Sequence, residues 1–310
     1  MKLISIVTPT FNEEDNIELL ISTLKECVSS LRGVYKFEFI IIDNNSTDGT
    51  RDIIRRICHK DKTVKAIFNT RNFGHIRSPY WGIMQGQGDA VIYLASDFQD
   101  PPELLLSFIK HWESGSKIVY GVKPQSEEET IFNKIRRLYY RILNTISETN
   151  LTMNATGFGL YDKRVIEHLR EIKDPYPYLR GLVDELGYKI TKIDFIQPPR
   201  KRGLSKNNAY TLYDIAMLGV ISHSKVPLRF SIAFGVLSGV ASIILSVLIL
   251  LMKLFNWESV TTGLAIIGAA ILFLFGVMFV VVGVLGEYVI SIHTYVKKRP
   301  IVVEDERINF

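Results

Sequence analysis

The chain has 310 residues, and 47% of them are hydrophobic. Its mean hydropathy of +0.15 is high for a soluble domain and low for a polytopic channel or carrier. The net charge of +5 would suit nucleic acid, but membrane proteins are also basic on their cytoplasmic side, so we expect no nucleic-acid partner. Two cysteines are too few for a disulfide framework or a Cys-built metal site, which fits a reducing compartment.

The first hundred residues alternate between strand-like and helix-like segments. Residues 3–11 (LISIVTPTF) form a short apolar run that soon turns acidic, which predicts a first strand and no signal peptide. Residues 16–31 follow with apolar side chains at helical spacing. Further strands are expected at residues 37–43, 64–70 and 90–96, and further helices at residues 51–58 and around residues 78–86. This alternation predicts an α/β domain with a Rossmann-like, mainly parallel sheet and helices on both faces.

Polar motifs follow each of the four expected strands. They occupy residues 8–13, 43–48, 71–75 and 97–100. Because ligands of parallel sheets bind at the carboxyl ends of the strands, we expect these four loops to form one site. An NAD-binding domain has the same alternation, but the first turn, TPTFNEEDN, lacks the Gly-x-Gly-x-x-Gly that lets a backbone approach a pyrophosphate. The sequence therefore argues against a dehydrogenase.

Two segments combine basic and apolar residues. Residues 130–147 carry isoleucines and a leucine on one helical face with Lys and Arg beside them, which suits a helix on anionic lipid or one packed on the sheet or a neighbouring subunit. Residues 210–224 are a second candidate for an interfacial helix. The glycine-containing stretch at residues 198–206 is basic and suits either phosphate binding or a positive patch beside the membrane.

Two charge-free segments near the C-terminus are long enough to cross a bilayer as helices. They run from Ser231 to Met252 and from Val260 to Leu285. Buried helices of a soluble core would rarely be this long without a charge. The connector is short, so the helices should be antiparallel neighbours. Lys225 and Arg229 precede the first span and residues 297–299 after the second are basic, which predicts that both termini are cytoplasmic.

The expected organisation has four parts. They are an α/β domain at residues 1–208, a juxtamembrane interfacial helix at 209–229, two transmembrane helices within 230–290 (about 231–252 and 260–285), and a cytoplasmic tail at 291–310. The predicted location is a membrane that the chain crosses twice, with the first domain and both termini on the cytoplasmic side.

Five motifs appear in order along the chain and are followed by the two spans. They read VTPTFNEEDNI, IIDNNSTDGT, TRNFGH, SDFQDPPE and PPRKRGLSK. With these motifs the chain resembles glycosyltransferase family 2, and within it the enzymes similar to dolichol-phosphate-mannose synthase. The resemblance implies a GT-A fold, a nucleotide-sugar donor, a polyprenyl phosphate acceptor, a divalent Mg²⁺ or Mn²⁺ ion and a homo-oligomer.

The same resemblance implies residues that bind the donor. Residues 9–13 match the motif that lines the nucleoside pocket, and an aromatic side chain beside polar groups suits a flat, hydrogen-bonding base. Asp43 matches the first acid of an Asp-Asp pair that contacts base or ribose, whereas Asn44 replaces the second acid and keeps an acceptor without the charge. The implied donor-binding set is Pro9, Phe11, Glu13, Asp43, Asn44, Arg71, Asn72, Ser96 and Gln99.

Asp97 is the predicted metal ligand, because a donor diphosphate needs a hard cation and a strand-end carboxylate can hold one. The family has Asp-x-Asp here, but this chain has Ala95 in place of the first acid. The metal would then depend more on the phosphates. Asp100 completes the motif or is a solvated loop acid.

The acceptor side is expected to bind phosphate through basic residues and to lack a general base. The resemblance places a proposed base before Phe-Arg-Leu, and the matching stretch at residues 156–160 has Gly157 for the acid and Gly159 for the arginine. A phosphate monoester is largely dianionic at neutral pH, so positioning by cations can replace a base. Asp184 and Glu185 are alternative acceptor-side acids or solvated helix residues. The predicted acceptor or diphosphate ligands are Arg200, Arg202, Ser205 and Lys206, of which Arg200 and Lys206 join Asp97 as catalytic residues.

The resemblance thus implies an inverting transferase that moves one sugar from a UDP-linked donor to undecaprenyl phosphate. It also implies that the enzyme works at the inner (plasma) membrane of a bacterium, for surface glycan or lipid modification. Two alternatives remain. The first, suggested by Ala95 and Gly157, is a catalytically weak family member that acts as a binding or assembly subunit. The second is a processive polysaccharide synthase, although the chain has two predicted spans and no Gln-x-x-Arg-Trp motif.

Overall fold

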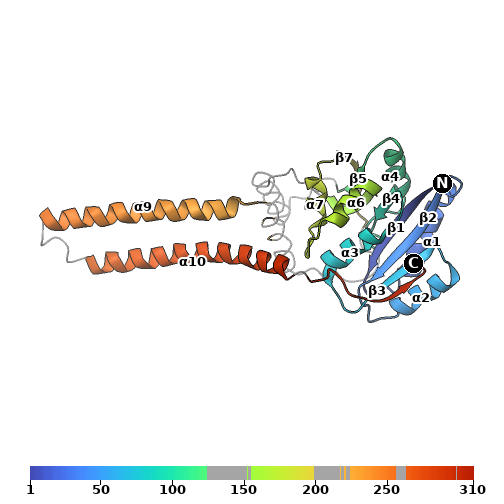
Figure 1. Cartoon of the computed structure of the whole chain (residues 1–310), viewed down its shortest axis with the longest axis horizontal. Coiled ribbons are helices and arrows are strands. Elements are labelled where there is room, and N and C mark those ends of the chain that lie inside the picture. The colour runs from blue at the N-terminus through green and yellow to red at the C-terminus, as the bar shows by residue number, and fades with distance from the viewer. Residues whose placement is uncertain are drawn as a thin grey trace. The chain divides into compact units, whose positions relative to one another are not determined.

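The computed structural model describes residues 1–123, 152, 155–198, 217, 220, 224–255, 263–297 and 299–310 (Figure 1). The chain divides into two compact units. The first unit contains the described residues up to 217 together with residues 299–310, and the second contains those from 220 to 297.

The first unit is built on an eight-stranded sheet in the order β7-β5-β6-β4-β1-β2-β3-β8. Its centre is parallel, because β1 pairs in parallel with β2 and β4, and β2 with β3. Strand β6 is antiparallel to β4 and β5, β5 is parallel to β7, and β8 is antiparallel to β3. The predicted α/β domain with a mainly parallel sheet is confirmed. The strands are β1 (Lys2–Thr10), β2 (Tyr35–Asp43), β3 (Val64–Asn69), β4 (Ala90–Tyr93), β5 (Ile118–Val122), β6 (Ala155–Asp162), β7 (Ile190–Asp194) and β8 (Glu304–Ile308).

Helices cover both faces of this sheet. One hydrophobic cluster joins the sheet to α1 (Ile17–Cys27), α2 (Thr50–Lys60) and α4 (Leu104–Glu113). A second cluster joins the opposite face to α3 (Gly74–Gln85), α6 (Lys163–Glu171) and α7 (Leu179–Glu185). A short 3₁₀ helix, η1 (Ser29–Leu31), follows α1.

The sequence pattern explains which side chains meet in these clusters. Along β1, Ile4 and Ile6 enter the first cluster and Val7 enters the second, as the alternation of a strand requires. In α1, Ile17, Leu20, Ile21 and Leu24 are all buried, and their spacing is that of one helical face. Both faces of the central strands are therefore apolar, which is typical of a parallel sheet between two helical layers.

Strand β4 ends earlier than its apolar sequence predicts. The run at residues 90–96 suggested a longer strand, but pairing stops at Tyr93. The N–H of Ala95 donates to Oδ2 of Asp100 over 2.9 Å instead of to a neighbouring strand. Phe98 then has a φ of 57°, which turns the backbone sharply. The local hydrogen bond thus converts the end of the strand into a tight loop that carries Asp97.

The second unit contains two apolar helices, α9 (Val226–Phe255) and α10 (Gly263–Val296). They run antiparallel, and the hydroxyl of Tyr288 donates to the carbonyl of Ser224 over 2.7 Å (Figure 1). Among the described residues, Phe273–Val296 is long and apolar enough to cross a membrane, and Val226–Ala241 is a shorter apolar segment. These helices associate the protein with membrane. Helix α9 extends beyond its expected span at both ends, and α10 continues past Leu285 to Val296.

Several predicted features lie outside the described residues. They include the basic helix at 130–147, Arg200, Arg202, Ser205 and Lys206, and most of the interfacial segment at 210–224. Within the segment expected to be a tail (residues 291–310), α10 continues to Val296 and residues 304–308 form β8 of the sheet. Four consecutive charged residues precede Ile308 in β8, so the segment has no apolar signal and its place in the sheet was not predicted.

Candidate active site

Four loops follow β1, β2, β3 and β4 at the same edge of the sheet, since these strands are parallel neighbours. Hydrogen bonds join the loops to one another. Thr8 at the end of β1 donates through Oγ1 to the carbonyl of Leu94 over 3.0 Å, and the N–H of Asn44 donates to the carbonyl of Thr10 over 2.9 Å. The loops predicted from the sequence are therefore brought together at one edge.

The loop after β1 is held against the loop after β2 by side-chain hydrogen bonds. Asn12 has a φ of 55°, and its N–H donates to Oγ of Ser46 over 2.8 Å. Oδ1 of Asn12 accepts the N–H of Thr47 over 2.8 Å. The N–H of Glu13 donates to Oγ1 of Thr50 over 2.9 Å, and its carboxylate accepts from the Asn16 amide over 2.6 Å. Serine and threonine of the second motif thus fix the backbone of residues 12 and 13.

Asp43, the last residue of β2, is fully buried at 0% exposure. Its two carboxylate oxygens accept the N–H of Ser46 at 3.1 and 3.3 Å, and Nε of Arg51 lies 3.4 Å from Oδ2. Burial raises the pKa of Asp43 above its usual value, while the hydrogen bonds from Ser46 and the charge of Arg51 act in the opposite direction. These contacts fix the carboxylate of Asp43 within the turn that follows β2.

Asn44 lies at the centre of a network that joins the loops after β2 and β3. Its Nδ2 donates to Oδ1 of Asn72 over 2.8 Å and to the carbonyl of Gly74 over 3.3 Å. Its Oδ1 accepts from Nδ2 of Asn69 over 3.1 Å and from the N–H of Phe73 over 2.9 Å. Both ends of the amide are engaged within the protein. An aspartate here would lose the two donated bonds, which explains why this chain has an amide in place of the expected acid.

Arg71, a predicted donor ligand, lies on the surface beside this network. Its guanidinium carbon sits 4.0 Å from the centre of the Phe73 ring, and its NH1 donates to the carbonyl of Asn72 over 3.1 Å. Phe73 is buried, so the cation rests on a fixed aromatic face. This geometry leaves a positive charge at the sheet edge where an anionic ligand would bind.

The loop after β4 places two carboxylates under cover. Asp97 is 8% exposed and accepts the N–H of Gln99 at Oδ1 over 3.2 Å. Asp100 is 5% exposed and accepts the N–H of Ala95. Burial, reinforced by the negative charge of Asp97, raises the pKa of Asp100 to about 6, against the opposing effects of Ala95 N–H and Lys123. Asp100 is therefore a buried acid and not a solvated one, which excludes that alternative.

These carboxylates fit a divalent cation that is held mainly by its other ligands. Within the described ranges, no group of three or more His, Cys, Asp or Glu side chains is placed to hold a metal ion. Asp97 offers hard oxygen ligands, which Mg²⁺ and Mn²⁺ accept, and Mg²⁺ commonly takes most of its ligands from water and phosphates. The like charge between Asp97 and Asp100 would also be relieved by a cation.

The missing base and arginine at residues 157 and 159 have a structural explanation. Gly157 has a φ of 93°, a conformation that L-residues rarely adopt. At Gly159 an added Cβ would lie 2.3 Å from the carbonyl oxygen of Val119 on β5. An acid at the first position would strain the backbone, and an arginine at the second would collide with the neighbouring strand. The close approach of β6 to β5 therefore requires glycine at 159.

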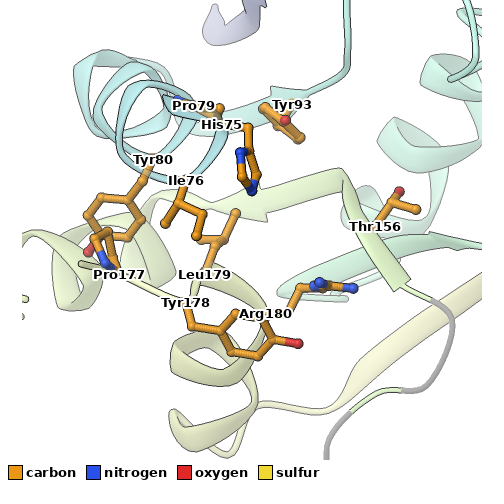
Figure 2. A pocket seen from close by; sticks show the side chains of 10 residues that line it. All are labelled: His75, Ile76, Pro79, Tyr80, Tyr93, Thr156, Pro177, Tyr178, Leu179 and Arg180. Carbon is orange, nitrogen blue, oxygen red and sulfur yellow. The ribbon is translucent and has the colours of Figure 1, made fainter. Parts of the chain in front are cut away.

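A cavity of about 160 Å³ opens between α3, β4, β6 and α7 (Figure 2). His75 on α3 and Arg180 on α7 lie on opposite sides of it (Figure 2). Arg180 donates through NH1 to the carbonyl of Ala155 over 2.8 Å, and its guanidinium lies 5.1 Å from the Tyr178 ring. The sequence did not indicate this aromatic and polar lining, apart from His75, which ends the polar motif at residues 71–75. The lining residues are His75, Ile76, Pro79, Tyr80, Tyr93, Thr156, Pro177, Tyr178, Leu179 and Arg180.

The alternative acids on α7 differ in their surroundings. Asp184 accepts the N–H of Thr152 over 2.7 Å and its hydroxyl over 2.9 Å. Glu185 is exposed. Asp184 thus anchors the segment before β6, and the surface position of Glu185 agrees with the solvated alternative.

The chain is similar to one protein family, to full-length relatives and to solved structures. The family model described as "Glycosyl transferase family 2" matches residues 5–170. The chain is 31% identical to "Uncharacterized glycosyltransferase YkcC" of Bacillus subtilis (strain 168), over 96% of this chain and 92% of that protein. It is 30% identical to "SfII prophage-derived bactoprenol glucosyl transferase" of Shigella flexneri, over 96% of both chains. Among solved structures, a mannosyltransferase of Pyrobaculum calidifontis has a TM-score of 0.46 and 16% identity, over 95% of this chain and 86% of that one.

Proposed function

Because the chain belongs to glycosyltransferase family 2 and has its GT-A fold, we propose that it transfers one sugar from a UDP-linked donor to undecaprenyl phosphate. The observation that carries this proposal is the presence, in one chain, of polar loops at the edge of a parallel sheet and of apolar helices that associate with membrane. Relatives that align over nearly the whole chain include bactoprenol glucosyl transferases. Transfer in a single displacement would invert the anomeric centre.

The donor nucleotide would bind along the loops after β1, β2 and β3. The buried carboxylate of Asp43 is an acceptor for an N–H of the base, and Phe11 from the neighbouring loop would contact its face. Arg71 contributes positive charge at the rim. The Asn44 network would act indirectly, since it fixes the loops that carry these groups.

Asp97 would hold the divalent cation, with Ser96 and Gln99 beside it in the same loop. When bound, Mg²⁺ or Mn²⁺ would neutralise charge on the nucleoside diphosphate as it departs. Asp97 is oriented for this role by the N–H of Gln99. Asp100 shapes the loop by accepting the N–H of Ala95.

The acceptor requires no general base in this mechanism. A phosphate monoester has its second pKa near 6 and is already a nucleophile at neutral pH. The glycines at 157 and 159, which leave no carboxylate or guanidinium there, agree with this mechanism. Arg200, Arg202, Ser205 and Lys206 lie outside the described residues, and we propose that they bind the acceptor phosphate or the diphosphate.

The membrane helices would bring the enzyme to its lipid acceptor. We propose that the protein lies in the bacterial inner membrane with two spans, with the catalytic domain and both termini in the cytoplasm, and that it forms a homo-oligomer. The basic residues at 225, 229 and 297–299 support this orientation. In such an arrangement the product would feed surface glycan or lipid modification.

One assay tests the proposed reaction. Purified full-length protein is incubated with radiolabelled nucleotide sugars, undecaprenyl phosphate and Mg²⁺ or Mn²⁺, and label is measured in the organic phase. We expect a lipid-linked product from a UDP-sugar. NMR of this product should show that the anomeric configuration is inverted relative to the donor. Folded protein that gives no lipid-linked product from any donor would contradict the proposal. Nucleotide binding without transfer would favour the binding-subunit alternative.

A further inference from the structure

The C-terminal segment after α10 is part of the sheet of the first unit. Strand β8 pairs antiparallel with β3, from Ala66 opposite Ile308 to Asn69 opposite Glu304. The carbonyl of Val303 accepts from the N–H and the hydroxyl of Thr70 at 3.1 and 3.2 Å. Residues 303–308 are therefore docked by backbone pairing along Ala66–Thr70, which is most of β3 and the residue after it.

Side chains of β8 also bind the helices on both faces of the sheet. Glu304 accepts from Nε1 of Trp81 on α3 over 2.5 Å. Glu306 accepts from Nε and NH2 of Arg55 on α2 at 3.1 and 2.8 Å. The strand thus contacts α2, β3 and α3, and each of these elements adjoins a loop of the candidate donor site.

A further contact of β8, made by Arg51 of α2, reaches the candidate site. NH2 of Arg51 lies 3.1 Å from Oδ2 of Asp305 on β8, and Nε lies 3.4 Å from Oδ2 of Asp43. Its guanidinium carbon is 5.0 Å from the centre of the Phe68 ring on β3. The Arg51 side chain is 21% exposed, Asp43 is 0% exposed, and Asp305 is 55% exposed. A single guanidinium therefore connects the surface of β8 to the buried carboxylate.

We propose that Arg51 is a positioning residue for donor binding, and that Asp305 of β8 holds its guanidinium against Asp43. This inference rests on the proposed function, in which Asp43 accepts a hydrogen bond from the nucleotide base. The planar guanidinium has a fixed arrangement of donors, so an anchor at NH2 also sets the direction of Nε. The segment that follows the membrane helix α10 in sequence thereby determines how the nucleotide pocket is ordered.

The burial of Asp43 explains why such an anchor is needed. A carboxylate without contact to water has to be stabilised by hydrogen bonds and a nearby cation. The N–H of Ser46 supplies the hydrogen bonds, and Arg51 supplies the cation. A guanidinium freed from Asp305 would sample other rotamers, and the carboxylate would be less well placed for the base.

Two matched variants of β8 distinguish the positioning of Arg51 from a general effect on the docking of the strand. Asp305→Asn and Glu306→Gln each neutralise one acid that pairs with an arginine of α2, but only the first pairs with the arginine that reaches Asp43. We expect Asp305→Asn to raise KM for the UDP-sugar about threefold to fivefold, with kcat within about twofold of wild type. Glu306→Gln should leave KM unchanged, although its ion pair is the closer one, at 2.8 Å.

A third variant and a binding measurement complete the test. Arg51→Lys keeps the charge but loses the planar arrangement of donors, and we expect KM and the Kd for UDP to rise about tenfold. The Kd is measured by calorimetry on the full-length protein without acceptor. The inference would be overturned if Asp305→Asn and Glu306→Gln changed KM equally. It would also be overturned if neither Asp305→Asn nor Arg51→Lys changed KM or the Kd. UDP binding without sugar transfer would overturn the proposed function alone, whereas a wild type that binds no nucleotide would overturn both.

Discussion

Nδ2 of Asn44 donates to Oδ1 of Asn72 over 2.8 Å, which joins the loop after β2 to the loop after β3. Replacing Asn44 by Asp removes this donor and places a carboxylate oxygen against Oδ1 of Asn72 and the carbonyl of Gly74. We expect Asn44→Asp to lower the free energy of unfolding by about 1–3 kcal/mol, seen as a lower Tm. Asn45→Asp makes the same chemical change one residue away, at a residue with a φ of 64° that Asp tolerates, and should have a much smaller effect. Equal Tm values for the two variants would contradict the role of the network.

Asp97→Asn should abolish transfer while the protein still folds and enters the membrane. The amide keeps an oxygen for the N–H of Gln99 but loses the charge that a divalent cation needs. We expect the rate of lipid-linked product formation to fall at least about 100-fold, with weaker Mn²⁺ binding by calorimetry. Asp52→Asn, at an acid that is 87% exposed, is the control and should behave as wild type. Near-normal activity of Asp97→Asn would remove this residue from the metal site.

Asp100 should make stability depend on pH. Its pKa in the folded protein, about 6, is above its ordinary value of 3.8, so the folded state binds the proton more tightly than the unfolded state. The free energy of unfolding therefore falls as pH rises from about 4 to 6. The full decrease, up to about 3 kcal/mol, is present above pH 6. We expect Asp100→Asn to raise Tm at pH 7.5 in EDTA and to change it little near pH 4. A Tm difference that is the same at both pH values would show that the charge of Asp100 is not the cause.

Gly159→Ala should destabilise the sheet. Its Cβ would lie 2.3 Å from the carbonyl oxygen of Val119 and 2.9 Å from Cδ1 of Tyr120, so β5 and β6 would have to separate. We expect a loss of about 3 kcal/mol in the free energy of unfolding, measured as a lower Tm. Gly33→Ala is the matched control, because nothing lies within 4 Å of the added Cβ. A Tm for Gly159→Ala equal to that of the control would show that β5 and β6 accommodate a side chain.

The central fold could be predicted because its signals are local. The apolar, β-branched runs that end at Thr10 and Asp43 form β1 and β2, and the helical spacing of Ile17, Leu20 and Leu24 forms α1. Strand β8 could not be found in this way. Its charged side chains are paired with Arg55 and Trp81, which lie more than 200 residues away in the sequence.

The position of the candidate site could be predicted because its loops follow the ends of the strands. The loops that contain Asp43 and Asp97 lie at the expected edge, while their roles toward donor and metal stay predictions. The amide network of Asn44 was not predicted, because a residue type does not reveal which partners surround it. Tyr178 and Arg180 were missed because the antiparallel pairing of β6 with β4 and β5 creates the cavity that they line.

The position of β8 also has a consequence for biosynthesis. The ribosome makes residues 304–308 after both apolar helices, so the β3 edge has no β8 to pair with until those helices have been synthesised. An open strand edge favours pairing with other chains, and the delay exposes the nascent domain to that risk. The delay also orders events, since the helices can enter the membrane before the sheet is finished. A complete enzyme would then arise only beside the lipid that carries its acceptor.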